Sequence, residues 1–416
     1  MIKTSRHTIK FTNTTKQLKL QNFLNEYRRV AQVYLDYLWN NEVKWNNKIL
    51  NVSKQQYDCP TFISTIKIPL TTTLSARALK CCSTQVCGIV KAILEKPRKR
   101  LFKLQELQKQ NKDCSKLQNK IRKHPITKPI ITQLNPELNS ICCDLLNVGN
   151  HFDSFLQLKS IGKSYGKIRI PIKHHRHSNK LKSKGKLLNS ILITDKEIQL
   201  RWEIPKVIKK SSGCVVGADQ GIKTVLTLSN STTTPLTDNH GHSFDSIIKR
   251  LSRKKKGSKA FTKTQQLRIN FINWSLNQLN LKNIKQINFE NIVNIGFKNK
   301  RSRYLSHFTN TLIRDKLLQL CDETGVTVTL QSSVYRSQRC SGCGLVRKAN
   351  RKGKNYTCSS CGLNLDADLN AAKNHEQTLP SIPFALRKLN LNLKGFIWKP
   401  NGFYDLTGKA LTVPSS

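Results

Sequence analysis

Four cysteines in the carboxyl-terminal part of the chain constrain its fold more than any other feature. They form two Cys-x-x-Cys pairs separated by fourteen residues, and a glycine follows each pair. The short spacing lets consecutive thiolates reach one ion, and Gly344 and Gly362 free the backbone to curl around it. Four thiolates leave no open coordination position, so the pattern predicts one structural Zn²⁺. The alternative, two redox motifs, lacks the βαβ surroundings of a thioredoxin-like fold. The predicted zinc ligands are Cys340, Cys343, Cys358 and Cys361.

A second constraint is the stretch from 215 to 226, VVGADQGIKTVL, which predicts a strand, a tight turn and another strand. Gly221 is expected to supply a turn conformation that a residue with a Cβ atom resists. Asp219 would then lie at the end of a buried strand, where an unpaired carboxylate is costly. Asp219 is therefore either a structural turn residue or a metal ligand.

Two more carboxylates occupy comparable places. Glu290 ends the apolar strand predicted in IKQINFENI, and Asp368 leads into a helix rich in small residues within LDADLNAAKN. An α/β sheet can bring such positions to one edge, and three adjacent carboxylates cannot all stay ionised without cations. Two Mg²⁺ ions about 4 Å apart would satisfy them and clamp the attacking and leaving oxygens of a phosphodiester. Separate turn and capping aspartates are the alternative.

The charge of the chain indicates a polyanionic partner. The 416 residues include 72 Lys and Arg against 24 Asp and Glu, a formal net charge of +48. This excess favours nucleic acid over a membrane surface, with a ribosomal or chromatin protein that only contacts phosphate as the alternative. No run of about 18 apolar residues predicts a membrane span. The 13 cysteines, mostly scattered, indicate a reduced, cytoplasmic protein rather than a disulfide framework.

Periodicity divides the first half of the chain. Residues 5–12 and 160–204 alternate like strands, whereas helical spacing begins at Lys16, so a helical part interrupts one β part. A helix over 70–95 is expected to end at Pro97, before a separate basic helix over residues 98–123. A polar loop between the later strands is expected to contact phosphate as a hairpin tip, because its lysines disfavour a metal site. The loop contains the histidines His174, His175 and His177.

The second half alternates helical and strand patterns. The basic stretch from 246 to 276 has helical spacing, and 308–324 predicts an amphipathic helix that Gly325 ends. The following VTVTLQ predicts a strand. The final segment has no recognisable motif, and its aromatic residues are expected to pack on the fold rather than contact nucleic acid. These residues are Phe396, Trp398, Phe403 and Tyr404.

Four motifs, taken in their order along the chain, resemble the RuvC nuclease domain of TnpB proteins. They are GADQG, INFEN, the CxxCG knuckles preceded by YRSQ, and DADLNAAKN. These are transposon-encoded RNA-guided endonucleases, relatives of Fanzor and of type V CRISPR effectors. The motifs cover about residues 213–375, and the N-terminal half matches only in the order of its parts. The resemblance implies an RNase H-like fold with Asp219, Glu290 and Asp368 as the metal-binding catalytic acids. Asp366 competes with Asp368, which is preferred because it begins the D-x-N-A-A pattern.

The resemblance also implies a domain organisation. The fold class would be α/β multidomain, with an RNase H-like (RuvC) nuclease domain carrying a zinc ribbon insertion. A β-barrel-like wedge domain with an inserted helical recognition domain would precede it. The expected parts are a wedge-like domain over 1–13 and 150–205, a helical recognition domain over 14–149, a RuvC-like domain over 206–331 and 362–378, a zinc ribbon over 332–361 and a C-terminal tail over 379–416.

The implied function is RNA-guided cutting of DNA beside a short adjacent motif, with two Mg²⁺ ions in the nuclease site and one structural Zn²⁺. The partners would be a guide RNA and target double-stranded DNA, bound in a basic channel that reads the backbone. We expect a monomer with one RNA. Alternatives are a compact type V CRISPR effector or a transitional form, a Fanzor protein, a guided DNA-binding regulator without cleavage, and an RNA-binding protein without a guide. The intact acids argue against the regulator.

Overall fold

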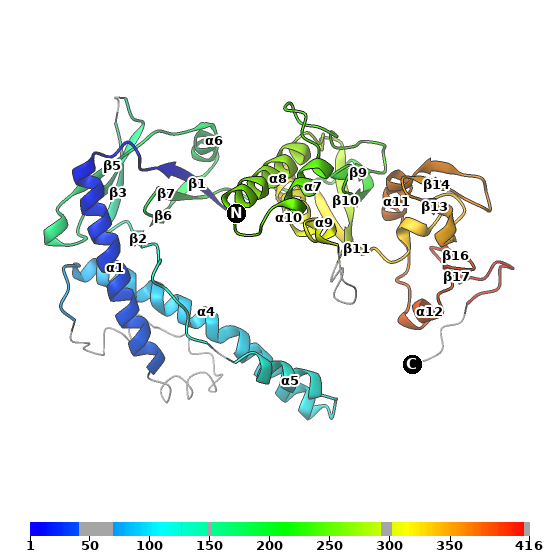
Figure 1. Ribbon diagram of the computed structural model, residues 1–416, viewed down its shortest axis with the longest axis horizontal. Coiled ribbons are helices and arrows are strands. Elements are labelled where there is room, and N and C mark those ends of the chain that lie inside the picture. The colour runs from blue at the N-terminus through cyan, green and yellow to red at the C-terminus, as the bar shows by residue number, and fades with distance from the viewer. Residues whose placement is uncertain (41–69, 126, 149–150, 293–301, 412–416) are drawn as a thin grey trace. The chain divides into compact units, whose positions relative to one another are not determined.

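The computed structural model describes residues 1–40, 70–125, 127–148, 151–292 and 302–411 (Figure 1). The chain divides into two compact units, Met1–Pro205 and Lys206–Ser416. Each unit has its own hydrophobic core, and each is described by itself. Within the described ranges, no helix is long and apolar enough to cross a membrane.

The amino-terminal unit contains two antiparallel sheets, ordered β1–β7–β6–β2 and β3–β4–β5. Strand β1 pairs with β7 from Ile2 opposite Glu203 to Thr8 opposite Glu197. The early strand and the later strands therefore form one β structure, as their alternating sequences indicate. The strands are β1 (Ile2–Thr8), β2 (Glu137–Asn139), β3 (Cys143–Asn147), β4 (Ser154–Leu158), β5 (Ile168–Ile172), β6 (Lys186–Ile193) and β7 (Glu197–Glu203).

These sheets differ from the expected arrangement in two ways. Within the described part of the unit, the two sheets share a core but no hydrogen-bonded ladder joins them into a closed barrel. Strands β2 and β3 also lie inside the stretch 14–149, for which the sequence predicts a helical domain. Each has at most five residues, which is too short for an alternating pattern to stand out.

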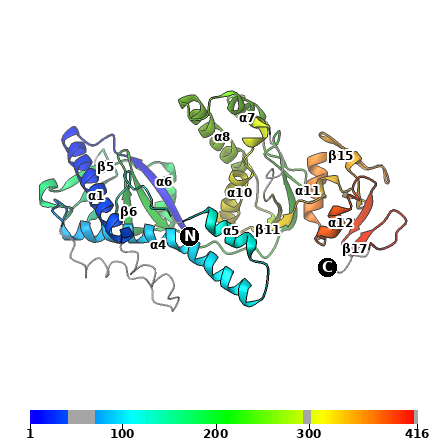
Figure 2. The same cartoon turned by 60° about the horizontal axis from the view of Figure 1, so that its bottom comes forward.

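The helices of this unit are α1 (Thr14–Asn40), α4 (Ala76–Lys109), α5 (Ser115–Lys123) and α6 (Arg176–Lys184). The prediction that Pro97 ends a helix was wrong, because α4 continues through it. A proline removes one ladder hydrogen bond, and here Glu95 forms ion pairs with Arg98 and Lys99 across the same turn. The chain reverses after Lys109 instead, and Figure 2 shows α4 and α5 as a helical hairpin.

The prediction of a loop at the three histidines was also wrong, because this segment begins α6. Its contact with phosphate stays a prediction. The ring of His175 caps the helix by accepting a hydrogen bond from the backbone N–H of Ser178 at 3.3 Å. The ring of His174 bonds Ser154 Oγ at 3.0 Å and Ser178 Oγ at 2.9 Å. Histidine is not among the usual capping residues, so no local signal marks the start of a helix here.

The carboxyl-terminal unit is built on a sheet ordered β11–β10–β8–β9. Strands β8 (Cys214–Gln220) and β9 (Leu226–Leu228) confirm the predicted strand, turn and strand. Strands β10 (Ile284–Asn291) and β11 (Thr327–Ser332) follow, and β10 is parallel to both β8 and β11. One face of this sheet shares a core with α7 (Phe244–Arg253), α8 (Lys259–Asn277) and α10 (Asn310–Thr324), and α11 (Ala367–Glu376) lies on the other side of the strands (Figure 1).

Local sequence explains how these helices begin and end. The basic stretch predicted to be helical forms two helices, because the helical backbone is interrupted between Arg253 and Lys259. Ser258 caps α8, because its side chain accepts a hydrogen bond from the backbone N–H of Phe261. Gly325 ends α10 with a left-handed φ of 74°, as predicted. A short helix, α9 (Arg303–Ser306), precedes α10.

The remaining elements form a small module around the four cysteines. The final segment belongs to it, because β16 pairs with β12 and β17 pairs with β16. Phe396 and Trp398 are each 2% exposed, which confirms that these two aromatic side chains pack on the fold. The elements are β12 (Leu345–Val346), β13 (Arg351–Lys352), β14 (Asn355–Thr357), β15 (Asn364–Asp366), α12 (Phe384–Lys388), β16 (Phe396–Lys399) and β17 (Gly402–Tyr404).

Candidate active site

Two of the predicted acids lie side by side at one edge of the sheet. Asp219 is near the end of β8 and Glu290 near the end of β10, and the parallel ladder sets Phe289 opposite Ala218. The next residue on each strand is therefore also adjacent, and both point to the face opposite the helices α7, α8 and α10. Asp219 is 8% exposed and Glu290 is 7% exposed. The backbone N–H of Gln220 donates to Glu290 Oε1 at 3.1 Å, which links the two strand ends.

The start of α11 separates the roles of Asp366 and Asp368. Asp366 is exposed and caps the helix, because its side chain accepts hydrogen bonds from the backbone of Asp368 at 2.9 Å and of Leu369 at 3.1 Å. Asp368 is buried in the first turn. Its Oδ2 lies 3.3 Å from the position that a Cβ atom at Gly221 would take, just beyond the end of β8. Asp368 therefore reaches the edge that holds Asp219, whereas the side chain of Asp366 caps the helix.

Two glycines give α11 this close approach to the sheet. A Cβ atom at Gly217 would lie 1.9 Å from the carbonyl oxygen of Ala372, so helix backbone and strand backbone are in direct contact. The prediction that Gly221 adopts a special turn conformation was wrong, because its φ is not positive. A Cβ atom there would meet Thr224 O at 3.0 Å, so Gly221 is needed for space beside Asp368.

A different face of α11 holds the cysteine module. The side-chain amide of Asn370 donates to the carbonyl of Arg339 at 2.8 Å, and its oxygen accepts from the backbone N–H of Ser341 at 3.0 Å. Asn374 donates to the same carbonyl of Arg339 at 2.7 Å. These two asparagines were missed as contact residues in the sequence, although their spacing of four residues places them on one helix face.

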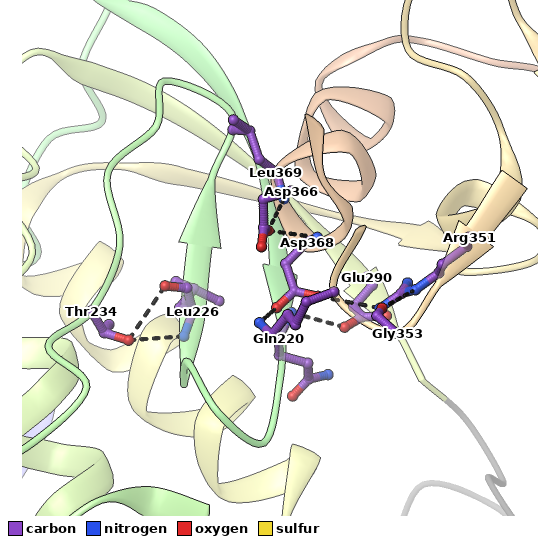
Figure 3. A network of polar contacts seen from close by, with 10 residues as sticks. Gln220, Leu226, Thr234, Glu290, Arg351, Gly353, Asp366, Asp368 and Leu369 are labelled. Carbon is purple, nitrogen blue, oxygen red and sulfur yellow. Dashed lines mark hydrogen bonds and ion pairs between the residues drawn. The ribbon is translucent and has the colours of Figure 1, made fainter. Parts of the chain in front are cut away.

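Two cations from the cysteine module reach Asp368. Arg351 of β13 donates to Asp368 Oδ1 at 3.2 Å, and Lys354, in the turn between β13 and β14, forms an ion pair with Oδ2. Figure 3 shows Asp368 and Arg351 pointing toward one another, with Glu290 and Gln220 beside them. Nothing in the sequence distinguishes these two residues from its many other cations, because only the folded hairpin brings them to the acid.

Burial and mutual repulsion disfavour negative charge at this edge. Burial, followed by the charges of Glu290 and Asp368, raises the pKa of Asp219 well above its usual range. Burial likewise raises the pKa of Glu290 to about 7, against the opposing hydrogen bond from Gln220. A divalent cation would offset this cost, and Mg²⁺ prefers hard carboxylate oxygens. The carboxylate oxygens at this edge are therefore suitable ligands for magnesium.

His375 joins the two strand acids, although no sequence motif singled it out. Asp219, Glu290 and His375 each offer a ligand atom, and these atoms lie within 4.8 Å of one another. His375 is 1% exposed, and its Nδ1 has no hydrogen-bond partner. Burial, and next the charge of Arg336, lowers the pKa of His375 to about 3. Its position seven residues after Asp368, two turns along the same helix face, was the available signal.

The four predicted zinc cysteines converge. Their Sγ atoms lie within 4.8 Å of one another, with 3.6 Å separating Cys340 from Cys361 and Cys343 from Cys358. Sulfurs at the corners of a tetrahedron around Zn²⁺ would be about 3.8 Å apart, because Zn–S bonds are about 2.3 Å long. The glycines that follow the pairs have left-handed φ values of 84° and 71°, as the motif requires. In the part of the chain that the structure describes, the acid and histidine group and this cysteine group are the two that could hold a metal ion.

The sequence of this region has known relatives. The Cas12f1-like TNB domain family matches residues 312–375. The CRISPR-associated endodeoxyribonuclease Cas12f1 of Sulfoacidibacillus thermotolerans is 38% identical over 74 residues, which is 18% of this chain and 18% of the relative. The segment matched by the domain family contains Asp368, His375 and the four cysteines, but neither Asp219 nor Glu290.

Two solved structures share the fold over most of the chain. The cryo-EM structure of a Cas12f1–sgRNA–target DNA complex matches 87% of this chain and 82% of its own, with a TM-score of 0.52 and 15% identity. The mini-RNA-guided endonuclease CRISPR-Cas_phi3 matches 92% of this chain and 94% of its own, with a TM-score of 0.53 and 10% identity. The chain therefore shares the α/β multidomain fold of these two structures. The TNB-domain match adds a sequence likeness over residues 312–375.

Proposed function

We propose that this chain is an RNA-guided DNA endonuclease of the TnpB or compact type V kind. The observation that carries the proposal is that Asp219 and Glu290 end neighbouring strands at one buried edge, with Asp368 at the start of α11 beside Gly221. Acids buried together are costly to a fold and are characteristic of sites that bind metal ions. The carboxyl-terminal unit would be the RuvC-like nuclease part with its zinc ribbon, and the amino-terminal unit the wedge and recognition parts.

Asp219 and Glu290, whose ligand atoms lie together, would hold Mg²⁺ with Asp368, which is buried beside Gly221. Cys340, Cys343, Cys358 and Cys361 would hold Zn²⁺. Magnesium would stabilise negative charge on the reacting phosphodiester. The chain itself buries the acids and fixes their spacing through the β8–β10 ladder and the docking of α11. The zinc module would act structurally, because four thiolates leave no open position.

The charge of the chain supports nucleic-acid partners. The net charge of +48 exceeds what solubility requires and suits a guide RNA and a target DNA. A groove of about 650 Å³ lies between α4 and α5, and basic side chains dominate its polar lining. Such a groove would follow a phosphate backbone without reading bases. The basic residues that line it are Lys99, Arg100, Lys103, Lys116 and Lys120.

Sequencing the RNA that copurifies with the protein tests guide use. The gene would be expressed with its native flanking DNA on both sides, and RNA bound to the purified protein would be sequenced. A discrete RNA that ends in the flanking element would identify the TnpB type. An RNA containing repeat-derived sequence would identify the compact type V effector. Heterogeneous RNA, obtained with both flanks present, would contradict guided cleavage.

Cleavage by matched variants tests the acids. Asp219→Asn, Glu290→Gln and Asp368→Asn should each abolish cleavage of a guide-matched DNA, with guide-dependent binding largely kept. Asp366→Asn is the control, because asparagine caps a helix as well as aspartate does, and it should cut normally. Normal cutting by any of the first three variants would remove that residue from the site. Binding without cleavage by the wild type, at any divalent metal tested, would favour a guided regulator.

A further inference from the structure

The helix α11 presents two polar side chains to the sheet, and the proposed function uses only one of them. Asp368 and His375 are seven residues apart, which is about two helical turns, so they lie on the same face. Gly217, Asp219 and Gly221 alternate along the face of the strand that α11 covers. Asp368 lies beside Gly221, and the backbone of His375 would be 2.8 Å from a Cβ atom at Gly217. Asp219, between the two glycines, therefore has Asp368 on one side and His375 on the other.

The environment of His375 is unusual for a residue that only fills space. Its side chain is 1% exposed, and Nδ1 is buried with no hydrogen-bond partner. Buried polar atoms are nearly always paired, so an unpaired nitrogen needs an explanation on a ring that offers a ligand atom close to two carboxylates. Other polar side chains of α11 do have partners, because Asn370 and Asn374 are fully engaged with the cysteine module.

The spacing of the three groups fits a shared ion. One ligand atom each from Asp219, Glu290 and His375 lies within 4.8 Å of the others. Two atoms that each lie about 2.1 Å from one ion are at most about 4.2 Å apart. Small side-chain movements would therefore bring all three groups onto one ion, with the ion replacing the missing partner of the imidazole.

We propose that His375 is a nitrogen ligand to a divalent ion held by Asp219 and Glu290, so that this position prefers a first-row transition metal such as Mn²⁺ over Mg²⁺. Imidazole is a ligand for transition metals, whereas Mg²⁺ prefers sites made of oxygen alone. This inference rests on the metal-binding part of the proposed function and is independent of cleavage. Asp368 lies on the other side of Asp219, where its two oxygens pair with Arg351 and Lys354.

Manganese binding to the full-length, nucleic-acid-free protein tests the proposal without any activity measurement. Mn²⁺ affinity would be measured by EPR titration, and electron spin-echo modulation would detect a directly bound ¹⁴N. The wild type should show ¹⁴N modulation from Mn²⁺. His375→Leu should lose the modulation and about tenfold in Mn²⁺ affinity, while its Mg²⁺ affinity, measured by competition, changes much less.

Controls separate a ligand from a structural residue. His307→Leu removes another partly buried histidine of the same unit whose Nε2 also lacks a partner, and it should keep the modulation. His375→Asn provides a second variant if leucine disturbs folding, and zinc content and the thermal transition would show whether each variant is folded. Asp219→Asn should remove Mn²⁺ binding at this position.

Each outcome decides a different point. Wild-type Mn²⁺ bound without ¹⁴N modulation, or modulation unchanged in a folded His375→Leu protein, would overturn the role of His375 and leave the acids as the metal site. Mn²⁺ binding that Asp219→Asn does not affect would overturn both the role of His375 and the proposed metal role of the acids.

Discussion

Nζ of Lys354 forms an ion pair with Oδ2 of Asp368, and this pair joins the β13–β14 turn to the first turn of α11. The carboxylate is 7% exposed and the lysine side chain is 34% exposed. The lysine supplies positive charge at an edge where Asp219 and Glu290 already resist ionisation because of burial. A metal ion that uses Asp368 as a ligand must therefore compete with Lys354.

The first prediction concerns this competition. Lys354→Met should raise the affinity of the acid site for Mg²⁺ by about 1.4- to fivefold, because partly exposed ion pairs contribute about 0.2–1 kcal/mol. Without added metal, the same variant should lower the free energy of unfolding of the carboxyl-terminal unit by a similar amount. Isothermal titration calorimetry and chemical denaturation would measure the two effects.

Lys352→Met, which removes an exposed lysine of the same hairpin, is the control. An unchanged or weaker Mg²⁺ affinity for Lys354→Met would show that the lysine does not compete.

The second prediction is a dependence of stability on pH. Glu290 has a folded-state pKa of about 7 against an ordinary value of 4.5, so between these values the folded state holds a proton that the unfolded state has released. In Mg²⁺-free buffer, the contribution of Glu290 to stability should fall as pH rises from about 4.5 to about 7 and then level off. Asp219 shifts in the same direction.

Glu290→Gln isolates this effect, because glutamine cannot titrate. The difference in free energy of unfolding between Glu290→Gln and the wild type should grow in favour of the variant as pH rises through this window. Urea denaturation at several pH values would measure it, and saturating Mg²⁺ should reverse it because the ion binds the ionised carboxylate. A difference that stays constant with pH would mean that Glu290 titrates normally in the folded protein.

The strand acids could be predicted from sequence because their local pattern carries the information. Asp219 and Glu290 each end an apolar strand, and parallel pairing brings such ends together. Asp368 was distinguished from Asp366 by a motif, and the physical reason for that motif is visible in the capping bond of Asp366 and in the contacts of Asn370.

The other residues at the site depend on contacts that no local pattern specifies. Arg351 and Lys354 reach Asp368 only because the hairpin lies against α11, and His375 meets Asp219 only because Gly217 lets the helix touch the strand. The passage of α4 through Pro97 is a similar case, since the preference of proline was outweighed by its surroundings.

The third prediction concerns the cysteine module. Replacing both Cys340 and Cys343 by serine should release one equivalent of zinc, because two of its four ligands are lost. The module should then lose stability, because structural Zn²⁺ contributes about 10–16 kcal/mol to the folding of such modules. The loss of stability should spread to α11, because Asn370 and Asn374 form hydrogen bonds with the first Cys-x-x-Cys pair and the residue before it. Elemental analysis would measure zinc, and hydrogen exchange would show faster exchange in residues 367–376. Cys214→Ser, at an exposed cysteine of the same unit, should change neither. Wild-type protein without zinc, or α11 protected in the double variant, would contradict this prediction.

The fourth prediction tests the contact between α11 and β8. Gly217→Ala places a methyl group 1.9 Å from Ala372 O and 2.3 Å from Glu376 N, and backbone atoms cannot move aside as a flexible side chain can. The variant should lose about 3 kcal/mol of stability in the carboxyl-terminal unit, at the upper end of the cost of overpacking. It should also lose cleavage, because α11 would carry Asp368 away from Asp219.

Gly342→Ala is the matched control, since its new methyl group would lie 3.6 Å from the nearest atom, at Leu363. Calorimetry and the cleavage assay would measure both variants. If Gly217→Ala were as stable and active as Gly342→Ala, the backbone contact that positions the third acid would be refuted.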